Sequence, residues 1–203
     1  MRIAVLGASG KVGRLLVEQA VERGHQVTAL VRTPEQFTVP PSGQIEVARA
    51  DVMSPDSFPD LSRCDAAVSA IGISKGDGPG ALAAGARLLA AAGGRTVWLG
   101  ALGTGASTNA GGKIYQAIMQ RVVGKEMPER EEADRTARDA GATVFHAPDL
   151  WVGAVSPKRR IAPLANVKRP VLPPHISRAT LAALMLDEAE KGGHGGEIVV
   201  PLS

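Results

Sequence analysis

The chain has 203 residues, 44% of them hydrophobic and 21% charged, with a formal net charge of +3, which fits one globular domain and argues against disorder. No apolar run approaches the roughly 20 residues of a membrane span, and a single cysteine, Cys64, excludes an internal disulfide. The first strand-like stretch begins at Arg2, which leaves no room for a removable signal peptide. We therefore expect a cytoplasmic protein without a membrane partner, and the wide spacing of the four histidines predicts no metal site.

Along the chain, short apolar runs alternate with longer amphipathic or alanine-rich stretches, the pattern of β-α-β units in a parallel sheet. We expect strands at residues 2–6, 26–31, 45–50, 66–71, 96–99, 143–147 and 197–201. We expect helices at residues 11–23, from 54, and at 80–92, 112–123, 128–140 and 177–191. The predicted fold is α/β, a single Rossmann-type domain over residues 1–203 with a doubly wound, mostly parallel sheet and helices on both faces.

Glycines and prolines mark several of these helix boundaries. Gly24, Gly93 and Gly141 each follow a predicted helix, where a left-handed C-cap favours glycine. Thr33-Pro34 and Ser54-Pro55 each pair a capping residue with proline at the first helical position, and so predict two helix starts.

A glycine-rich loop follows the first predicted strand and opens the first predicted helix, the context that makes a G-x-x-G-x-x-G motif informative. We expect Gly7 to make the tight turn, Gly10 to let a pyrophosphate approach the backbone, and Gly13 to let the helix pack closely. The helix N-terminus offers free N–H groups and a partial positive charge to phosphates. The predicted cofactor loop comprises Gly7, Ala8, Ser9, Gly10, Lys11, Val12 and Gly13, and the alternative is a tight turn without a ligand.

The end of the second predicted strand indicates which dinucleotide is bound. An Asp or Glu at this point accepts the ribose 2′-hydroxyl of NAD and repels a 2′-phosphate. This chain has Arg32 and Thr33 instead, with no acid until Glu35. The guanidinium of Arg32 suits a phosphate, and a helix beginning at Thr33 also favours an anion. We therefore predict NADP(H) as the cofactor, with a surface arginine that binds nothing as the alternative.

Two further strand ends extend the predicted cofactor site. After the third strand, Asp51 can accept the adenine amino group while Val52 packs on the ring, although Asp51 can equally satisfy local backbone donors. After the fourth strand, Ala70, Ile71 and Gly72 present a backbone with little side chain, which lets the cofactor pass close by.

Residues 151–176 are rich in proline and in basic residues. Five prolines forbid a long helix or a central strand, and no acidic residue occurs between Trp151 and Arg178. We interpret this segment as a loop that forms a wall on the substrate side, with a merely solvated loop as the alternative. The segment lacks interleaved aromatic residues, so we do not expect nucleic-acid binding.

Taken together, several motifs carry a resemblance to a known family: GASGKVG at 7–13, Val31-Arg32 with Pro34, Asp51-Val52, Ser69-Ala70-Ile71-Gly72 and Ile176-Ser177-Arg178. The chain resembles the atypical short-chain dehydrogenases of the NAD(P)H-binding, NmrA-like type, which include the flavin reductase/biliverdin reductase B group. This resemblance implies NADP(H) bound across the carboxyl ends of the strands. It also implies that Gly100 and Ala101, and Pro148, Asp149 and Leu150, flank the nicotinamide.

The chain departs from typical short-chain dehydrogenases in its proton relay. Those enzymes use a serine after the fifth strand and a Tyr-x-x-x-Lys motif on the next helix. Here the serine position reads Gly100-Ala101, and Tyr115 is followed four residues later by Met119. We expect Tyr115 to pack its helix, with a place in the pocket as the alternative. The loop hydroxyls of Thr104, Ser107 and Thr108 can replace the serine, although such groups usually face solvent. Asp149 is either an acid beside the nicotinamide or a structural partner. His146 is expected in or beside the sheet core.

The missing relay favours acceptors that need little more than contact with the hydride donor, because solvent can protonate a reduced flavin, quinone or conjugated system. Our leading hypothesis is an NADP(H)-dependent oxidoreductase acting on a small molecule, with a pocket formed by Leu102, Tyr115, Leu150, Trp151 and the basic segment. The alternative from another class is a non-catalytic, NmrA-like redox sensor. A nucleotide-sugar epimerase is less favoured because no sizeable C-terminal substrate domain follows. The predicted helix over 112–123 can serve a dimer or the core equally, so we expect a monomer or a homodimer.

Overall fold

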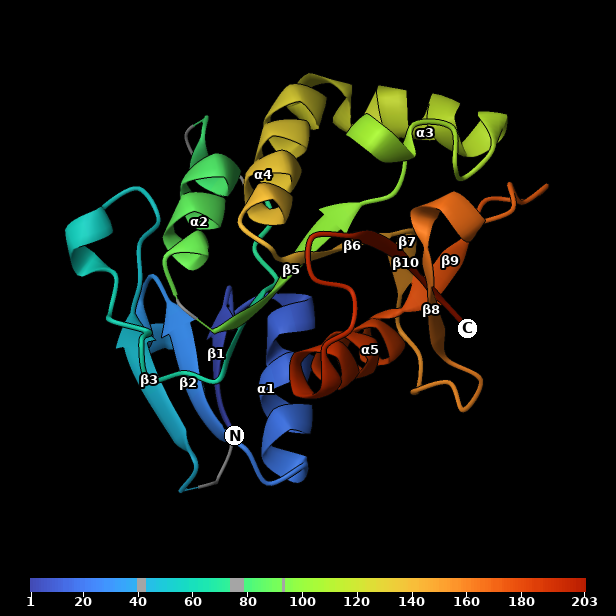
Figure 1. The fold of residues 1–203 in the computed structure, drawn as a ribbon. Coiled ribbons are helices and arrows are strands. Elements are labelled where there is room, and N and C mark those ends of the chain that lie inside the picture. The colour runs from blue at the N-terminus through green and yellow to red at the C-terminus, as the bar shows by residue number, and fades with distance from the viewer. Residues whose placement is uncertain (40–42, 74–78, 93) are drawn as a thin grey trace.

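The computed structural model describes residues 1–39, 43–73, 79–92 and 94–203 (Figure 1). Its centre is an eight-stranded sheet in the order β3-β2-β1-β4-β5-β6-β10-β8, in which every neighbouring pair is parallel except the antiparallel pair of β10 and β8. The strands are β1 (Arg2–Leu6), β2 (Gln26–Val31), β3 (Ile45–Arg49), β4 (Ala66–Ser69), β5 (Arg95–Ala101), β6 (Thr143–Ala147), β8 (Arg160–Pro163) and β10 (Ile198–Leu202). Beyond β6, β7 (Asp149–Trp151) and β9 (His175–Ser177) form a separate parallel pair.

Helices cover both faces of the sheet, as Figure 1 shows. The helices are α1 (Lys11–Glu22), α2 (Ala81–Ala90), α3 (Lys113–Val123), α4 (Met127–Asp139) and α5 (Arg178–Lys191). α1 and α5 pack on one face, with a core around Phe145, and α2 and α4 pack on the other, around Trp98. α3 closes a smaller core with Leu102. The continuous apolar strands are explained by this double cover, because both faces of a doubly wound sheet are buried.

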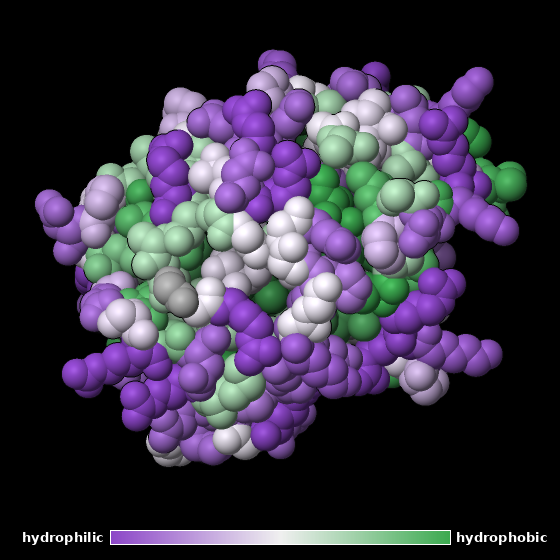
Figure 2. Space-filling view, in the orientation of Figure 1, coloured by the Kyte–Doolittle hydropathy of each residue, from purple (hydrophilic) through white to green (hydrophobic). Residues whose placement is uncertain are grey.

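The strand order reverses between β1 and β4. The chain runs from β1 outward to β2 and β3, and then returns to place β4, β5 and β6 on the other side of β1. A crevice at the carboxyl ends of β1 and β4 is therefore the expected ligand site of this topology. In Figure 2, hydrophilic residues cover the lower part of the view, whereas apolar residues reach the surface around the carboxyl ends of β5 and β6.

The predicted α/β fold is confirmed, and three predicted strands, β1, β2 and β6, have the predicted ends. The strand expected at 66–71 ends at Ser69, because Ala70 and Ile71 leave the sheet to line the pocket described below. The expectation of a wholly irregular segment over 151–176 is wrong, because this segment contains β8 and begins β9. β8 is an edge strand with Pro163 at its last position, where the missing backbone N–H of proline costs little. The prolines of this segment therefore exclude a central strand but not an edge strand.

The predicted helix boundaries hold in part. Gly24 and Gly141 adopt φ values of +81° and +89°, as left-handed C-caps require, whereas Gly93 lies outside the described residues. Thr33 and Ser54 each precede only a single 3-10 turn, and neither side chain makes a capping hydrogen bond. The helix expected to begin at Thr33 is therefore only a 3-10 turn in this described stretch. One such turn is too short to have a helix dipole that would attract an anion.

Candidate functional site

The loop between β1 and α1 has the tight geometry that its glycines predict. Gly7 has a φ of +78°, a left-handed conformation that favours glycine. A Cβ on Gly13 would overlap the carbonyl oxygen of Gly7, so only glycine lets the first turn of α1 pack this closely on the loop. Gly10, by contrast, has an ordinary extended conformation, and a Cβ there would meet no backbone atom closer than 3.2 Å.

The loop leaves backbone donors available at the start of α1. The Gly10 amide donates to the Gly7 carbonyl at 2.9 Å, and the Arg14 amide donates to the Gly10 carbonyl at 2.9 Å. Between them, the amides of Lys11, Val12 and Gly13 have no hydrogen-bond acceptor among the residues that the structure describes. Because α1 has twelve residues, these amides and the positive end of its dipole make a phosphate-binding position.

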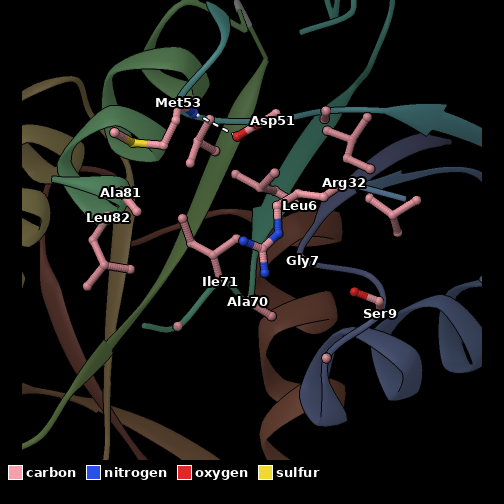
Figure 3. Close-up of a pocket in the computed structure, with 16 residues that line it drawn as sticks. Leu6, Gly7, Ser9, Arg32, Asp51, Met53, Ala70, Ile71, Ala81 and Leu82 are labelled. Carbon is pink, nitrogen blue, oxygen red and sulfur yellow. Dashed lines mark hydrogen bonds between the residues drawn. The ribbon is translucent and has the colours of Figure 1, made fainter. Parts of the chain in front are cut away.

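A pocket, partly open to solvent, lies at the reversal of the strand order (Figure 3). Four strand ends and the start of α2 form its walls. It is lined by Leu6, Gly7, Ser9, Gly10, Leu30, Val31, Arg32, Ala50, Asp51, Val52, Met53, Ala70, Ile71, Gly72, Ala81 and Leu82. Its mixture of apolar walls with a few polar groups is typical of a site for a small organic ligand or cofactor.

One basic side chain points into this pocket. Arg32 follows the last residue of β2, and Figure 3 shows its guanidinium reaching across the opening. The nearest acid in sequence, Glu35, pairs with Arg49 at 3.1 Å on the exposed surface. The carboxylate of Glu35 thus pairs with Arg49, and the guanidinium of Arg32 brings positive charge to the pocket. Thr33 is exposed and does not line the pocket.

Asp51 and its neighbours close the far end of the pocket beyond β3. The amide of Met53 donates to Asp51 Oδ1 at 3.0 Å, so this carboxylate satisfies a local backbone donor, which was one of the two expected roles. Asp51 and Val52 also line the pocket, and the adenine role therefore stays a prediction for them.

Nine of the predicted cofactor residues line the pocket: Gly7, Ser9, Gly10, Arg32, Asp51, Val52, Ala70, Ile71 and Gly72. Ala8, Val12 and Gly13 are buried beneath the loop, and Lys11 is exposed at the start of α1. Sequence reasoning missed Met53, Ala81 and Leu82 as lining residues. Met53 adjoins a predicted pair, but nothing in the local sequence indicates that the start of α2 folds over this pocket.

The other predicted residues lie at the ends of β5 and β6, outside this pocket. Gly100 and Ala101 end β5, Pro148 is buried, Asp149 is exposed, and Leu150 packs against the core. A Cβ on Gly100 would lie 2.7 Å from a carboxylate oxygen of Asp134. The glycine at this position is therefore explained by the packing of α4, and its cofactor role stays a prediction.

Asp134 belongs to a buried polar network on the α4 side of the sheet. Trp98 Nε1 donates to Asp134 Oδ1 at 2.9 Å. His146 Nε2 lies 3.1 Å from Asp134 Oδ2, an ion-pair distance without the alignment of a hydrogen bond, and His146 Nδ1 lies 2.6 Å from Ser107 Oγ. His146 is 1% exposed, as expected of a residue in the sheet core. This network holds the loop after β5 in place.

Replacing Asp134 with alanine is expected to lower the free energy of unfolding by about 2–4 kcal/mol, because Trp98 and His146 would lose a buried partner. Chemical denaturation measures the change. Asp139→Ala is the matched control, since Asp139 lies on the same helix and makes only an exposed contact with Arg138, so a loss below about 0.5 kcal/mol is expected there. Equal losses in the two variants would contradict the structural importance of the network.

Two expectations about the substrate pocket are wrong. Leu102 and Tyr115 are 1% and 3% exposed, and they form a closed small core with Met119 and Val200 instead of lining a pocket. Burial, with a smaller effect of Asp149, raises the pKa of Tyr115 well above its usual value, which disfavours proton transfer by this phenol. The expected packing role of Tyr115 is thus confirmed.

The loop hydroxyls also differ from expectation. Thr104 and Ser107 are fully buried, not solvent-facing. Thr104 Oγ1 donates to the Ala101 carbonyl at 2.7 Å, and Ser107 Oγ accepts from the Gly103 amide at 2.9 Å. These hydroxyls satisfy the backbone of the loop, and only Thr108 is exposed.

The basic segment is anchored to the rest of the domain. Arg159 Nε donates to Asp187 of α5 at 3.1 Å, and Ser177 Oγ donates to the Ala154 carbonyl at 2.8 Å. Trp151 is 54% exposed. Over the described ranges, no cluster of three or more His, Cys, Asp or Glu side chains is arranged to bind a metal, and no helix there is long and apolar enough to span a membrane.

Comparison with known proteins gives one match over most of the chain: a protein family described as NAD(P)H-binding matches residues 7–191. A curated relative, the uncharacterised protein YwnB of Bacillus subtilis, is 34% identical over 76 residues. That match covers 37% of this chain and 34% of YwnB, so it spans about a third of the relative's length.

Solved structures share the fold over the whole chain. A proposed NADH-flavin reductase from Streptococcus pneumoniae superposes with a TM-score of 0.74 at 24% identity, covering 100% of this chain and 99% of that one. ChuY, an anaerobillin reductase from Escherichia coli O157:H7, superposes with a TM-score of 0.79 at 17% identity, covering 100% and 97%. At these identities the likeness concerns the fold alone.

Proposed function

The chain belongs to the NAD(P)H-binding family, and from this premise we propose that it is an NADP(H)-dependent reductase of planar acceptors such as flavins or quinones. The observation that carries the proposal is the pocket at the strand reversal, which is lined by Arg32 and by Gly7, Ser9 and Gly10 of the glycine-rich loop, directly before the available amides at the start of α1. Fold neighbours described as an NADH-flavin reductase and an anaerobillin reductase support the choice of acceptor. Both names refer to planar conjugated molecules.

The strand order gives the direction in which the coenzyme would lie. The amides at the start of α1 would hold the pyrophosphate above β1. The walls at Asp51 and Met53, on the β2 and β3 side, would hold the adenosine end. The nicotinamide would then extend over β4, β5 and β6, toward β7. When bound, NADPH supplies a hydride, and the residues of the chain orient it and exclude water.

The preference for NADP(H) over NAD(H) rests on Arg32. A guanidinium at the end of β2 can donate two hydrogen bonds to a 2′-phosphate, and none of the three residues directly after β2 is an Asp or Glu that would accept a 2′-hydroxyl. Glu35 is engaged with Arg49.

The proposed acceptors follow from the proton chemistry. A relay tyrosine is unavailable because Tyr115 is buried with a raised pKa, and the loop hydroxyls of Thr104 and Ser107 are engaged with backbone groups. A flavin or quinone can accept a hydride and gain its proton separately, whereas an isolated ketone depends on a positioned donor.

The direct test is steady-state oxidation of NADPH by the purified protein with FMN, menadione and a simple aliphatic ketone. We expect turnover with FMN and menadione, and turnover with the ketone lower by about 100-fold or more, which is the usual contribution of a positioned acid. A ketone rate equal to the flavin rate would contradict the proposed acceptor class. Tight NADPH binding without turnover of any acceptor would instead support the non-catalytic, NmrA-like sensor.

A further inference from the structure

One exposed face near the expected nicotinamide end is not explained by packing. β7 and β9 pair in parallel, with Asp149 opposite His175 and Trp151 opposite Ser177. Side chains alternate along the pair, and Ile176 is 1% exposed and lies in the core with Leu150 packed beside it. Asp149, Trp151 and His175 lie on the other face, and all three are exposed.

The position of this face follows from the sheet. β7 begins two residues after β6 ends, and Figure 1 shows β7 and β9 beside the carboxyl end of β6. The Leu102 amide donates to the Ala147 carbonyl at 2.8 Å, so the loop after β5 reaches the same place. Asp149 is also near enough to Tyr115 to help raise its pKa, although burial is the larger cause. The face therefore borders the end of the sheet that a nicotinamide would reach.

His175 differs from the other three histidines. His25 contacts Glu190 at 2.8 Å, His146 contacts Ser107 at 2.6 Å, and His194 contacts Glu188 at 2.9 Å. His175 makes no hydrogen bond or ion pair with any residue in the described ranges. Its ring instead meets the exposed ring of Trp151 edge-on, with centroids 4.5 Å apart.

We propose that His175 donates a proton to the planar acceptor and that Trp151 provides the surface on which the acceptor stacks. This inference rests on the proposed reductase function. An acceptor lying on an indole gains stacking energy and is thereby held against the imidazole of His175, whereas an aliphatic ketone would not be held there. Asp149 on β7 is the charged group that the register sets beside His175, with Tyr115 of α3 farther on.

The step balances in atoms and electrons. The acceptor gains two electrons and one hydrogen as hydride from NADPH, and the N–H bond of the His175 imidazolium breaks as its proton joins the acceptor oxygen or nitrogen. NADP⁺ and a neutral imidazole remain, and solvent then returns a proton to His175.

The experiment compares wild type with His175→Gln and with His194→Gln, a control histidine whose partner is Glu188. We expect His175→Gln to lower kcat with FMN by about 10- to 100-fold and to leave the affinity for NADPH unchanged. We expect His194→Gln to behave as wild type. In the coenzyme-free wild type, the ring-proton NMR signals of His175, assigned by their loss in His175→Gln, should shift when FMN is added.

The two proposals fail differently. An unchanged kcat in His175→Gln, or unshifted His175 signals on addition of FMN, would overturn the role of His175 while leaving the reductase standing. A wild type that oxidises no NADPH would remove the reductase instead. Because His175 is exposed and its ring meets only Trp151 among the contacts described, both variants are expected to fold, and circular dichroism checks this.

Discussion

Gly10→Val is expected to weaken NADPH binding by about 100-fold or more while the protein remains folded. Gly10 is at the N-cap of α1 with φ −73° and ψ 168°, a conformation that any residue adopts, and its Cβ would meet the Gly7 carbonyl oxygen at 3.2 Å. The Gly7 carbonyl would have to shift by a few tenths of an ångström, and the added methyl groups would occupy the approach to the free amides, where a pyrophosphate needs a bare backbone. A 100-fold loss equals about 2.7 kcal/mol of binding free energy. Isothermal titration calorimetry measures it.

Gly43→Ala is the matched control for this variant. A Cβ on Gly43 meets nothing within 4 Å, and Gly43 does not line the cofactor pocket, so the same kind of change there should leave NADPH binding unaltered. Wild-type affinity in a folded Gly10→Val protein would show that the coenzyme does not approach the backbone at this loop.

Arg32→Ala is expected to weaken NADPH binding by about 10- to 100-fold and to leave NADH binding nearly unchanged. A hydrogen bond to a charged group contributes about 1.5–3 kcal/mol, and each 1.4 kcal/mol is tenfold in affinity. Arg32→Lys should lie between the two, because lysine keeps the charge but loses the two-pronged donor. Dissociation constants for both coenzymes, measured by calorimetry, test the prediction.

The control for charge alone is Arg49→Ala. Arg49 ends β3 close to the same region, but its partner is Glu35 and its side chain is 57% exposed. If Arg49→Ala lowers the NADPH affinity as much as Arg32→Ala does, Arg32 acts only by long-range electrostatic attraction. A direct contact between Arg32 and the 2′-phosphate would then be contradicted.

The adenosine half of the candidate site could be predicted because its residues are local to strand ends. Gly7 and Arg32 each follow a predicted strand, and Ala70 lies near the end of another. Parallel strands bring their carboxyl ends to one edge, so the meeting of these residues follows from the topology. The conformation of Gly7 and the close packing at Gly13 also follow from the motif itself.

The acceptor half could not be predicted, because its residues depend on long-range packing. Leu102 and Tyr115 were expected to line a pocket, but they meet Val200, nearly ninety residues away, and close a core. The packing of Gly100 could not be predicted either, because nothing in its neighbourhood in sequence reveals that the carboxylate of Asp134 fills the space of its missing side chain. His175 was passed over because the pairing of β7 with β9 joins segments about 25 residues apart, across a stretch without periodicity.

The central claim is that the loop of β1 and α1, together with Arg32, binds a dinucleotide with a 2′-phosphate. The most direct test is a pair of equilibrium titrations of the wild-type protein, one with NADPH and one with NADH. The account predicts saturable binding of NADPH with an affinity at least about tenfold greater than that for NADH. Binding of neither coenzyme, or tighter binding of NADH, would contradict it.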